Sequence, residues 1–284
     1  MAALSEEQQM IKDQASAWVR EQAPVSTFRA MRDQDLAQGF FSETWQAMIE
    51  MGWTGLVVPE TYGGAGLGYQ TLGLVLEQLG RNLVASPLYA SSVVGAAALM
   101  HSGSEDQKQA LLPKIADGGR LVVLALEEGP RHNPSQIKCR AEMTSSGVTL
   151  SGTKQFVMEG NAATDFVVAA NVDHGAGEQG VGLFLVACDT PGVRRHAVKT
   201  MDSRGYASVT FDDVALDLEA MLAGPDTGQA VLEAVLDVAT AALAAEMLGT
   251  AAASFDMTLD YLKTRKQFGQ VIGGFQALGH RAAG

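Results

Sequence analysis

The spacing of apolar residues along the 284-residue chain changes from helical to strand-like and back, and this double change most constrains the fold. From Ser5 to about Gly118, apolar residues recur every three to four positions, as on the buried face of amphipathic helices. From Leu121 they form short runs separated by turns, which is typical of strands. After Gly224 the helical spacing returns and continues through Arg265. Helices and strands in separate stretches favour an α+β fold over alternating βαβ units.

This order predicts three regions. Residues 1–120 are expected to form an N-terminal all-α domain, residues 121–224 a central antiparallel β domain, and residues 225–284 the start of a C-terminal helical bundle. Ser5, Ser42 and Ser104 each precede acidic residues and are therefore expected to begin helices. The predicted strands are residues 121–126, 148–150, 155–158, 166–170, 182–187 and 208–211. Turns are expected at Ser151–Gly152 and at 190–192.

Composition excludes several classes of protein. The net charge of −12 argues against binding nucleic acid through its phosphates. Cys139 and Cys188 lie far apart without metal-ligand spacing, so neither a disulfide framework nor a metal site is expected. The N-terminus lacks a basic region followed by an apolar run, and the most apolar long window, residues 231–248, contains three acidic residues. We therefore expect a soluble, cytoplasmic protein without a membrane span.

Residues 265–276 carry the pattern Arg-x-x-Phe-Gly-x-x-Ile-x-x-Phe-Gln, eight residues before the last residue of the sequence. This pattern resembles the segment of acyl-CoA dehydrogenases that joins the first two helices of their C-terminal bundle. In that family the segment touches the FAD of a neighbouring subunit. The resemblance therefore places Arg265, Phe268 and Gln276 in a cofactor site. The guanidinium of Arg265 suits a pyrophosphate, and the amide of Gln276 suits an adenine or flavin edge.

Four further segments resemble the same family and occur in its order, so that the resemblance covers nearly the whole chain. They are the Pro-Glu-Thr-Tyr-Gly-Gly run at 59–64, the Leu-Ala-Leu-Glu-Glu-Gly run at 124–129, the segment 150–160 and the Phe-Asp-Asp-Val run at 211–214. The resemblance implies an FAD flavoprotein of lipid metabolism, an oxidoreductase that acts on the CH–CH bond of an acyl-CoA substrate. It also implies an electron-transfer acceptor and a homo- or hetero-oligomer.

The flavin side of the implied site departs from the family pattern. Leu126 and Glu127 fall in the flavin loop, and Glu127 stands where many members have a hydrogen-bonding Thr. Phe156 falls at the aromatic position beside the isoalloxazine, although a strand Phe also packs in a core. Met158 replaces a second Thr. Because each lost hydrogen bond is worth about 0.5–1.5 kcal/mol, we expect this chain alone to bind FAD weakly.

No catalytic base is assigned from the sequence. In most members the carboxylate that removes the α-proton lies in a late loop beyond position 284, and in a minority it lies where this chain has Ala239. Glu246 returns to the helix face of Ala239 after seven residues but lies roughly 10 Å farther along the axis. It is therefore a candidate catalytic residue, and the alternative is a buried Glu paired with a neighbouring helix.

Two alternative functions stay open. The pattern from Met201 to Val214 departs from the commoner Gly-x-Arg-x-Ser and resembles members that form heteromeric, sterol-degrading enzymes. By this resemblance, the first alternative is that the chain is a non-catalytic subunit of a heteromeric acyl-CoA dehydrogenase. It could also be an acyl-CoA-binding module without redox activity. A long apolar stripe on residues 232–262 needs partners, from further chain or from another subunit.

Overall fold

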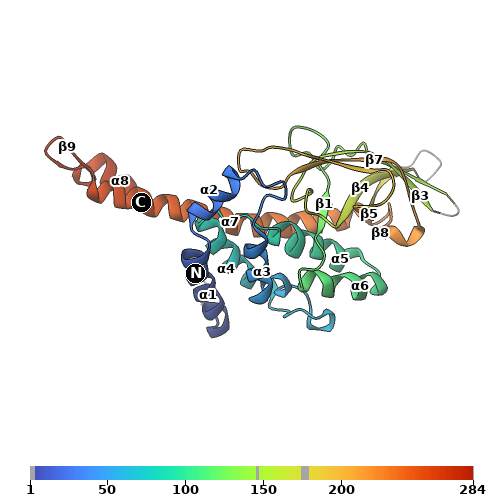
Figure 1. The fold of residues 1–284 in the computed structure, drawn as a ribbon, viewed down its shortest axis with the longest axis horizontal. Coiled ribbons are helices and arrows are strands. Elements are labelled where there is room, and N and C mark those ends of the chain that lie inside the picture. Colours follow the sequence, from blue (N-terminus) through green and yellow to red (C-terminus); the bar gives the residue numbers. More distant parts are fainter. Residues whose placement is uncertain (1–3, 145–146, 174–178, 284) are drawn as a thin grey trace.

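The computed structural model describes residues 4–144, 147–173 and 179–283. Within this part of the chain, no helix has both the length and the apolar character needed to cross a bilayer. The predicted α+β class is confirmed: a helical N-terminal region, a central β region and C-terminal helices follow one another, and the sheet covers one side of the helices (Figure 1).

The N-terminal region is built from short helices. Its elements are α1 (Glu6–Gln22), α2 (Val25–Asp33), α3 (Ser42–Glu50), η1 (Trp53–Gly55), η2 (Glu60–Tyr62), α4 (Gly68–Arg81), the π-helix η3 (Leu88–Gly95), α5 (Ala96–Ser102) and α6 (Glu105–Ala116). Ser5 and Ser104 cap α1 and α6 through reciprocal bonds with Gln8 and Gln107, as expected from their sequence. Ser42, by contrast, is the first residue of α3 rather than its cap.

The central region is one mixed sheet. Its strands are β1 (Val122–Ala125), β2 (Arg140–Met143), β3 (Val148–Val157), β4 (Asp165–Asp173), β5 (Gln179–Ala187), β6 (Val193–Ala197), β7 (Ala207–Leu216) and β8 (Met221–Ala223). They lie in the order β6-β7-β3-β2-β4-β5-β8, and β1 pairs with β4. The sheet was expected to be antiparallel, but β1 and β2 each run parallel to β4. Long intervening segments allow these two crossovers.

The turn predicted at Ser151–Gly152 is wrong, because both residues lie inside β3. Gly152 has φ +151°, and a Cβ on it would lie 2.8 Å from the Cα of Cys139. The glycine is therefore required by a close approach between two backbone segments and not by a chain reversal. The strands predicted at 148–150 and 155–158 are consequently one strand.

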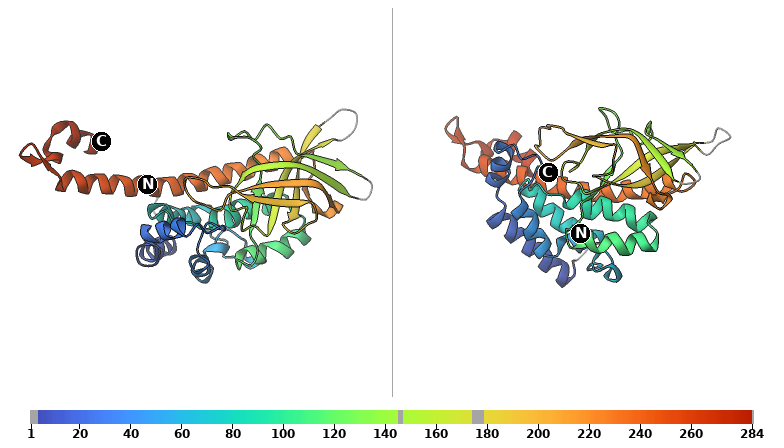
Figure 2. Two further views of the ribbon diagram at one scale, coloured as in Figure 1. Left: turned by 45° about the horizontal axis from the view of Figure 1, so that its top comes forward. Right: turned by 45° about the vertical axis from the view of Figure 1, so that its right-hand side comes forward.

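The C-terminal region begins with α7 (Gly228–Thr264), followed by β9 (Lys266–Gln267), β10 (Gln270–Val271), η5 (Ile272–Gly274) and α8 (Gln276–Ala283). The first part of α7 lies along both the N-terminal helices and the sheet, whereas its last part extends beyond them (Figure 2). Helix α7 approaches the backbone of α4 very closely at Gly249, where an added Cβ would lie 1.8 Å from the carbonyl oxygen of Glu77. Glycine here allows the two helix backbones to touch.

Candidate active-site cleft

A cavity of about 200 Å³ lies where the three regions meet. The N-terminal wall comes from η3, the β wall from the end of β1 and from β3, and the C-terminal wall from α7. The lining residues are Tyr89, Ala90, Val94, Leu124, Leu126, Glu127, His132, Gln155, Phe156, Val157, Met158, Leu236 and Ala239. Most of these side chains are apolar; the polar ones are Glu127, His132 and Gln155 on the β wall and Tyr89, through its hydroxyl, on the N-terminal wall. A mostly apolar cleft with a few placed polar groups is typical of small-molecule sites.

Phe156 presents its ring to this cleft although it lies in a strand. Its side chain is 41% exposed, and its φ of +49° lies in the left-handed region. The irregularity falls where the register between β3 and β7 shifts, between Lys154 and Val157. A left-handed conformation at a bulky residue costs on the order of 1–3 kcal/mol and is concentrated at functional sites. The sequence indicated Phe156 but not this strained backbone.

Glu127 lines the cleft, and two hydrogen-bond partners hold its carboxylate. The Nδ1 atom of His132 lies 2.5 Å from Oε1, and the backbone N–H of Asn133 donates to Oε2 at 3.0 Å. The backbone N–H of Gln155 donates to the carbonyl oxygen of Glu127 at 2.6 Å and so joins this loop to β3. The pairing with His132 had no signal in the sequence, because both residues lie in a loop without regular spacing.

A buried ion pair supports this loop from behind. Lys154 is fully buried, and its ammonium donates to Glu128 Oε1 at 2.6 Å and to the carbonyl oxygen of Leu126 at 3.0 Å. Glu128 also accepts from the backbone N–H groups of Lys138 and Cys139, at 2.7 and 2.9 Å. The pair therefore holds the backbone at Leu126, next to Glu127, and connects it to the backbone at Lys138 and Cys139.

The α7 wall is tied to the N-terminal wall by Tyr89. The hydroxyl of Tyr89 donates to the carbonyl oxygen of Ala239 at 3.1 Å. Burial raises the pKa of Tyr89 to about 12, with a smaller contribution from the negative charge of Glu246. The phenol is therefore neutral at physiological pH and remains a hydrogen-bond donor.

Glu246 lies in a charged cluster next to the cleft and is not among the lining residues given above. Arg204 lies 3.1 Å from Oε1 of Glu159 through Nε and 3.1 Å from Oε1 of Glu246 through Nη1. Its Nη2 donates to the carbonyl oxygen of Ser86 at 2.9 Å. Burial raises the pKa of Glu159 to about 7, although Arg204 opposes this shift. The cluster joins all three regions of the chain.

The structure brings together only part of the predicted cofactor site. Leu126, Glu127, Phe156 and Met158 line one cleft. Arg265, Phe268 and Gln276 lie at the far end of α7 (Figure 1). Arg265 follows Ala239 by 26 residues, which corresponds to roughly 39 Å of helix. Phe268 is 90% exposed and packs edge-on against Phe275. These three residues therefore lie away from the cleft of their own chain.

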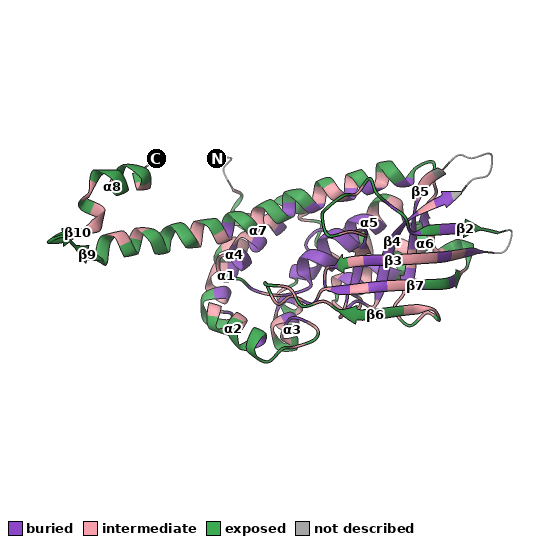
Figure 3. Cartoon of the chain, turned by 90° about the horizontal axis from the view of Figure 1, so that it is seen from above, coloured by how far each residue is buried: buried purple, intermediate pink, exposed green. Residues whose placement is uncertain are grey.

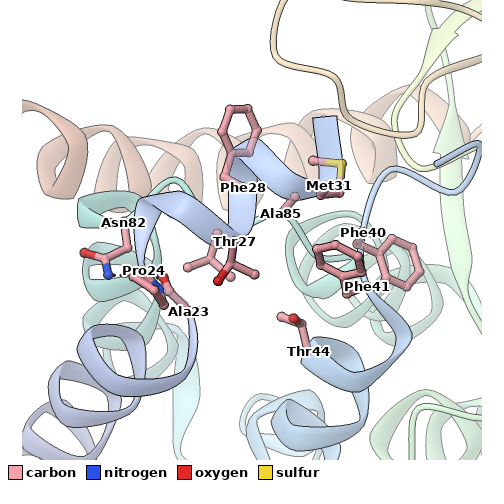
Figure 4. Close-up of a pocket in the computed structure, with 11 residues that line it drawn as sticks. Ala23, Pro24, Thr27, Phe28, Met31, Phe40, Phe41, Thr44, Asn82 and Ala85 are labelled. Atoms are coloured by element: carbon pink, nitrogen blue, oxygen red, sulfur yellow. Dashed lines mark hydrogen bonds between the residues drawn. The ribbon is translucent and has the colours of Figure 1, made fainter. Parts of the chain in front are cut away.

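Two other cavities are poorer candidates. The first, between α2 and α3, measures about 10 Å³ and is lined mainly by aromatic and methyl-bearing side chains (Figure 4). It holds no more than a water molecule. The second, of about 300 Å³, lies between α2 and residues 197–204. Its Lys199 is paired with Asp35 at 2.5 Å and its Arg204 with two glutamates, so these cations are already neutralised.

Comparison with known proteins places both helical regions in one family. Residues 5–119 match the N-terminal domain of acyl-CoA dehydrogenases, and residues 226–284 match their C-terminal domain. Acyl-CoA dehydrogenase FadE27 of Mycobacterium tuberculosis is 34% identical over 91% of this chain and 66% of its own. Mitochondrial 2-methylacyl-CoA dehydrogenase of Solanum tuberosum is 31% identical over 82% of this chain. The chain spans 58% of that relative's length.

Solved structures show the same relationship. A variant of the Tcur3481-Tcur3483 steroid ACAD superposes with a TM-score of 0.85 at 33% identity, covering 98% of this chain and 72% of that one. The ChsE4-ChsE5 complex from Mycobacterium tuberculosis superposes with a TM-score of 0.87 at 30% identity, covering 99% and 73%. The two proteins are thus similar to this chain in the β region as well as in the helices.

Proposed function

We propose, because the chain belongs to the acyl-CoA dehydrogenase family, that its cleft binds an acyl-CoA thioester for dehydrogenation between the α and β carbons. FAD is the cofactor that this family implies. The observation that carries the proposal is Phe156, an exposed aromatic ring held by a strained backbone in an apolar cleft that all three regions build. Such a ring offers a flat face for stacking.

The cleft residues fit the ring system of FAD. Phe156, Met158, Leu124 and Leu126 supply a flat apolar wall. Arg265 suits the pyrophosphate, and because it lies far from the cleft of its own chain, we propose that it acts on the cofactor of a neighbouring subunit. When bound, FAD supplies the acceptor for the hydride, and the electrons leave to an external electron-transfer acceptor.

This chain's own residues bind and orient the thioester rather than remove its proton. Among the described lining residues, Glu127 is the only carboxylate, and two donors already hold it. Glu246 is paired with Arg204. We therefore propose that the α-proton passes to a carboxylate supplied by further chain or by another subunit.

Flavin content tests this assignment. We expect Phe156→Ala to lower the affinity for FAD, measured by fluorescence titration of the purified protein, because the ring loses its stacking surface. The matched control is Phe255→Ala on the exposed part of α7. Equal FAD affinity in Phe156→Ala and the parent would remove Phe156 from the site. A parent that binds neither FAD nor any acyl-CoA would overturn the proposed function.

A non-catalytic subunit of a heteromeric acyl-CoA dehydrogenase is the second candidate. The observation that favours it is the combination of Ala239 at the base position with two glutamates that are both engaged. Similarity to a steroid ACAD and to the two-component ChsE4-ChsE5 complex supports it. Arg265→Ala distinguishes the candidates in the assembled enzyme, where it should lower flavin content if this chain completes its partner's cofactor site. Unchanged flavin content would count against that role.

A further inference from the structure

Part of the cleft lies between η3 and α7 and forms an arm of it. Its walls are the small apolar residues Ala90, Val94, Leu236 and Ala239. Tyr89 is 9% exposed and lies on this arm, with its hydroxyl 3.1 Å from the carbonyl oxygen of Ala239 on the opposite wall. A side chain bonded from one wall to the other closes the space between them. Tyr89 therefore marks the end of the arm.

The surroundings of Tyr89 make this end polar. Glu246 and Arg204 both act electrostatically on the phenol, so the charged cluster lies close to it. Arg204 is held there by Glu159, Glu246 and the carbonyl oxygen of Ser86. An alkyl chain that extended past Tyr89 would meet ion-paired groups that it cannot hydrogen-bond. Displacing such groups from their partners costs free energy.

From this arrangement we propose that Tyr89 is the specificity-determining residue of the cleft and restricts it to short-chain acyl-CoA thioesters. The inference rests on the proposed function and adds the substrate class to it. The whole cavity measures about 200 Å³, less than the about 300–1,000 Å³ usual for small-molecule sites, so it leaves little room for a long acyl chain.

Chain-length dependence of binding tests the inference. The dissociation constants of CoA and of butyryl-, hexanoyl-, octanoyl- and decanoyl-CoA are measured by calorimetry on the FAD-supplemented full protein. Each methylene that fits strengthens binding about fourfold, and each that does not fit adds nothing or weakens it. For the parent we expect tighter binding of butyryl-CoA than of CoA, and at least tenfold weaker binding of octanoyl-CoA than of butyryl-CoA.

Three variants at one position separate volume from hydrogen bonding. Tyr89→Ala opens the arm and should tighten octanoyl-CoA binding at least tenfold relative to the parent. Tyr89→Leu, a smaller loss of packing, serves if the Ala variant does not fold, and it should shift the preference in the same direction. Tyr89→Phe keeps the ring and should keep the parent's ranking.

The possible results distinguish a failure of this inference from a failure of the proposed function. A parent that prefers octanoyl- or decanoyl-CoA over butyryl-CoA would overturn the inference and leave the proposed function intact. The same holds if folded Tyr89→Ala or Tyr89→Leu keeps the parent's chain-length ranking. If no acyl-CoA binds to the parent more tightly than CoA, the proposed function fails and this inference falls with it.

Discussion

The two halves of α7 differ sharply although they belong to one helix. The proximal half, residues 228–249, contributes all the buried positions described for α7, including Leu232, Val235 and Ala239. The distal half, residues 250–264, has intermediate or exposed residues throughout (Figure 3). Its large apolar side chains include Phe255, 47% exposed, and Met257, 73% exposed. Apolar character alone therefore does not decide burial in this helix.

Contacts with the rest of the chain explain the difference. Gly249 touches the backbone of α4, Glu246 joins the Arg204 cluster, and Ala239 lines the cleft. In the distal half, Arg81 reaches Asp256, and that ion pair is largely solvent-exposed. Contiguous exposed apolar side chains mark interaction surfaces in soluble proteins. The distal half therefore exposes apolar side chains of the kind that the proximal half buries in the folded core.

The largest expected effect tests the buried ion pairs of Arg204, which attach the proximal half of α7 to the rest of the chain. Arg204→Met leaves Glu159, which is fully buried, and Glu246 without their partner. Removing one member of a buried ion pair costs about 3–5 kcal/mol, and we expect a loss of that size in the free energy of unfolding measured with urea. The control is Arg194→Met, which breaks an exposed pair with Asp212 and should cost less than about 1 kcal/mol. Equal losses would show that the cluster does not anchor α7.

The next effect tests the helix contact itself. Gly249→Val places two methyl groups where even a Cβ lies 1.8 Å from a backbone oxygen of α4. Because backbone cannot rotate away as a side chain can, we expect a loss of about 3 kcal/mol. Ala251→Val is the control, two residues into the exposed distal half, where only helix propensity of about 0.5 kcal/mol changes. Thermal unfolding of both variants decides whether the two halves differ as described.

Much of this fold could be predicted from the sequence, because local patterns decide it. The capping serines at positions 5 and 104 and the apolar spacing of α4 predicted helices that the structure contains. In the central sheet, strands β2, β6 and β8 were missed, and so was the short hairpin of β9 and β10. Two of them, β2 and β6, have mostly exposed residues, so an apolar run does not mark them. Gly152 was misread because a turn and a close backbone approach both require glycine.

The candidate site could be predicted only in part. Phe156, Met158, Leu126 and Glu127 were indicated by resemblance, and the structure places them in one cleft. Their role as cofactor ligands stays a prediction. Tyr89 and the Arg204 cluster were not indicated, since their partners lie as far as 150 residues away in the sequence. Contacts at such separation follow from tertiary packing, which no local spacing encodes.

An effect of similar size concerns the pH dependence of the cluster formed by Arg204, Glu159 and Glu246. The unfolded pKa of Glu159 is its ordinary 4.5, and burial raises the folded pKa to about 7. Between these values the folded state holds the proton more tightly, so the contribution of Glu159 to stability is fully present below pH 4.5 and is lost as the pH rises through 7. The slope is at most about 1.4 kcal/mol per pH unit for one proton. Urea unfolding from pH 4.5 to 8 should show this decrease in the parent but not in Glu159→Gln. Parallel curves would contradict the shift.

The smallest expected effect lies on the distal half. Phe255→Ser removes an exposed ring, so we expect the free energy of unfolding to change by no more than about 0.5 kcal/mol when the protein is measured as a monomer, verified by sedimentation. Leu232→Ser, at a position 1% exposed in the proximal half, is the matched control and should cost about 3 kcal/mol or more, because it places a hydroxyl in the core. In an assembled form, Phe255→Ser should weaken association without lowering the monomer's stability, since its ring then loses a partner and not a core contact. A monomer destabilised by more than about 1 kcal/mol would mean that Phe255 packs within its own chain, and the distal half would then belong to the core as the proximal half does.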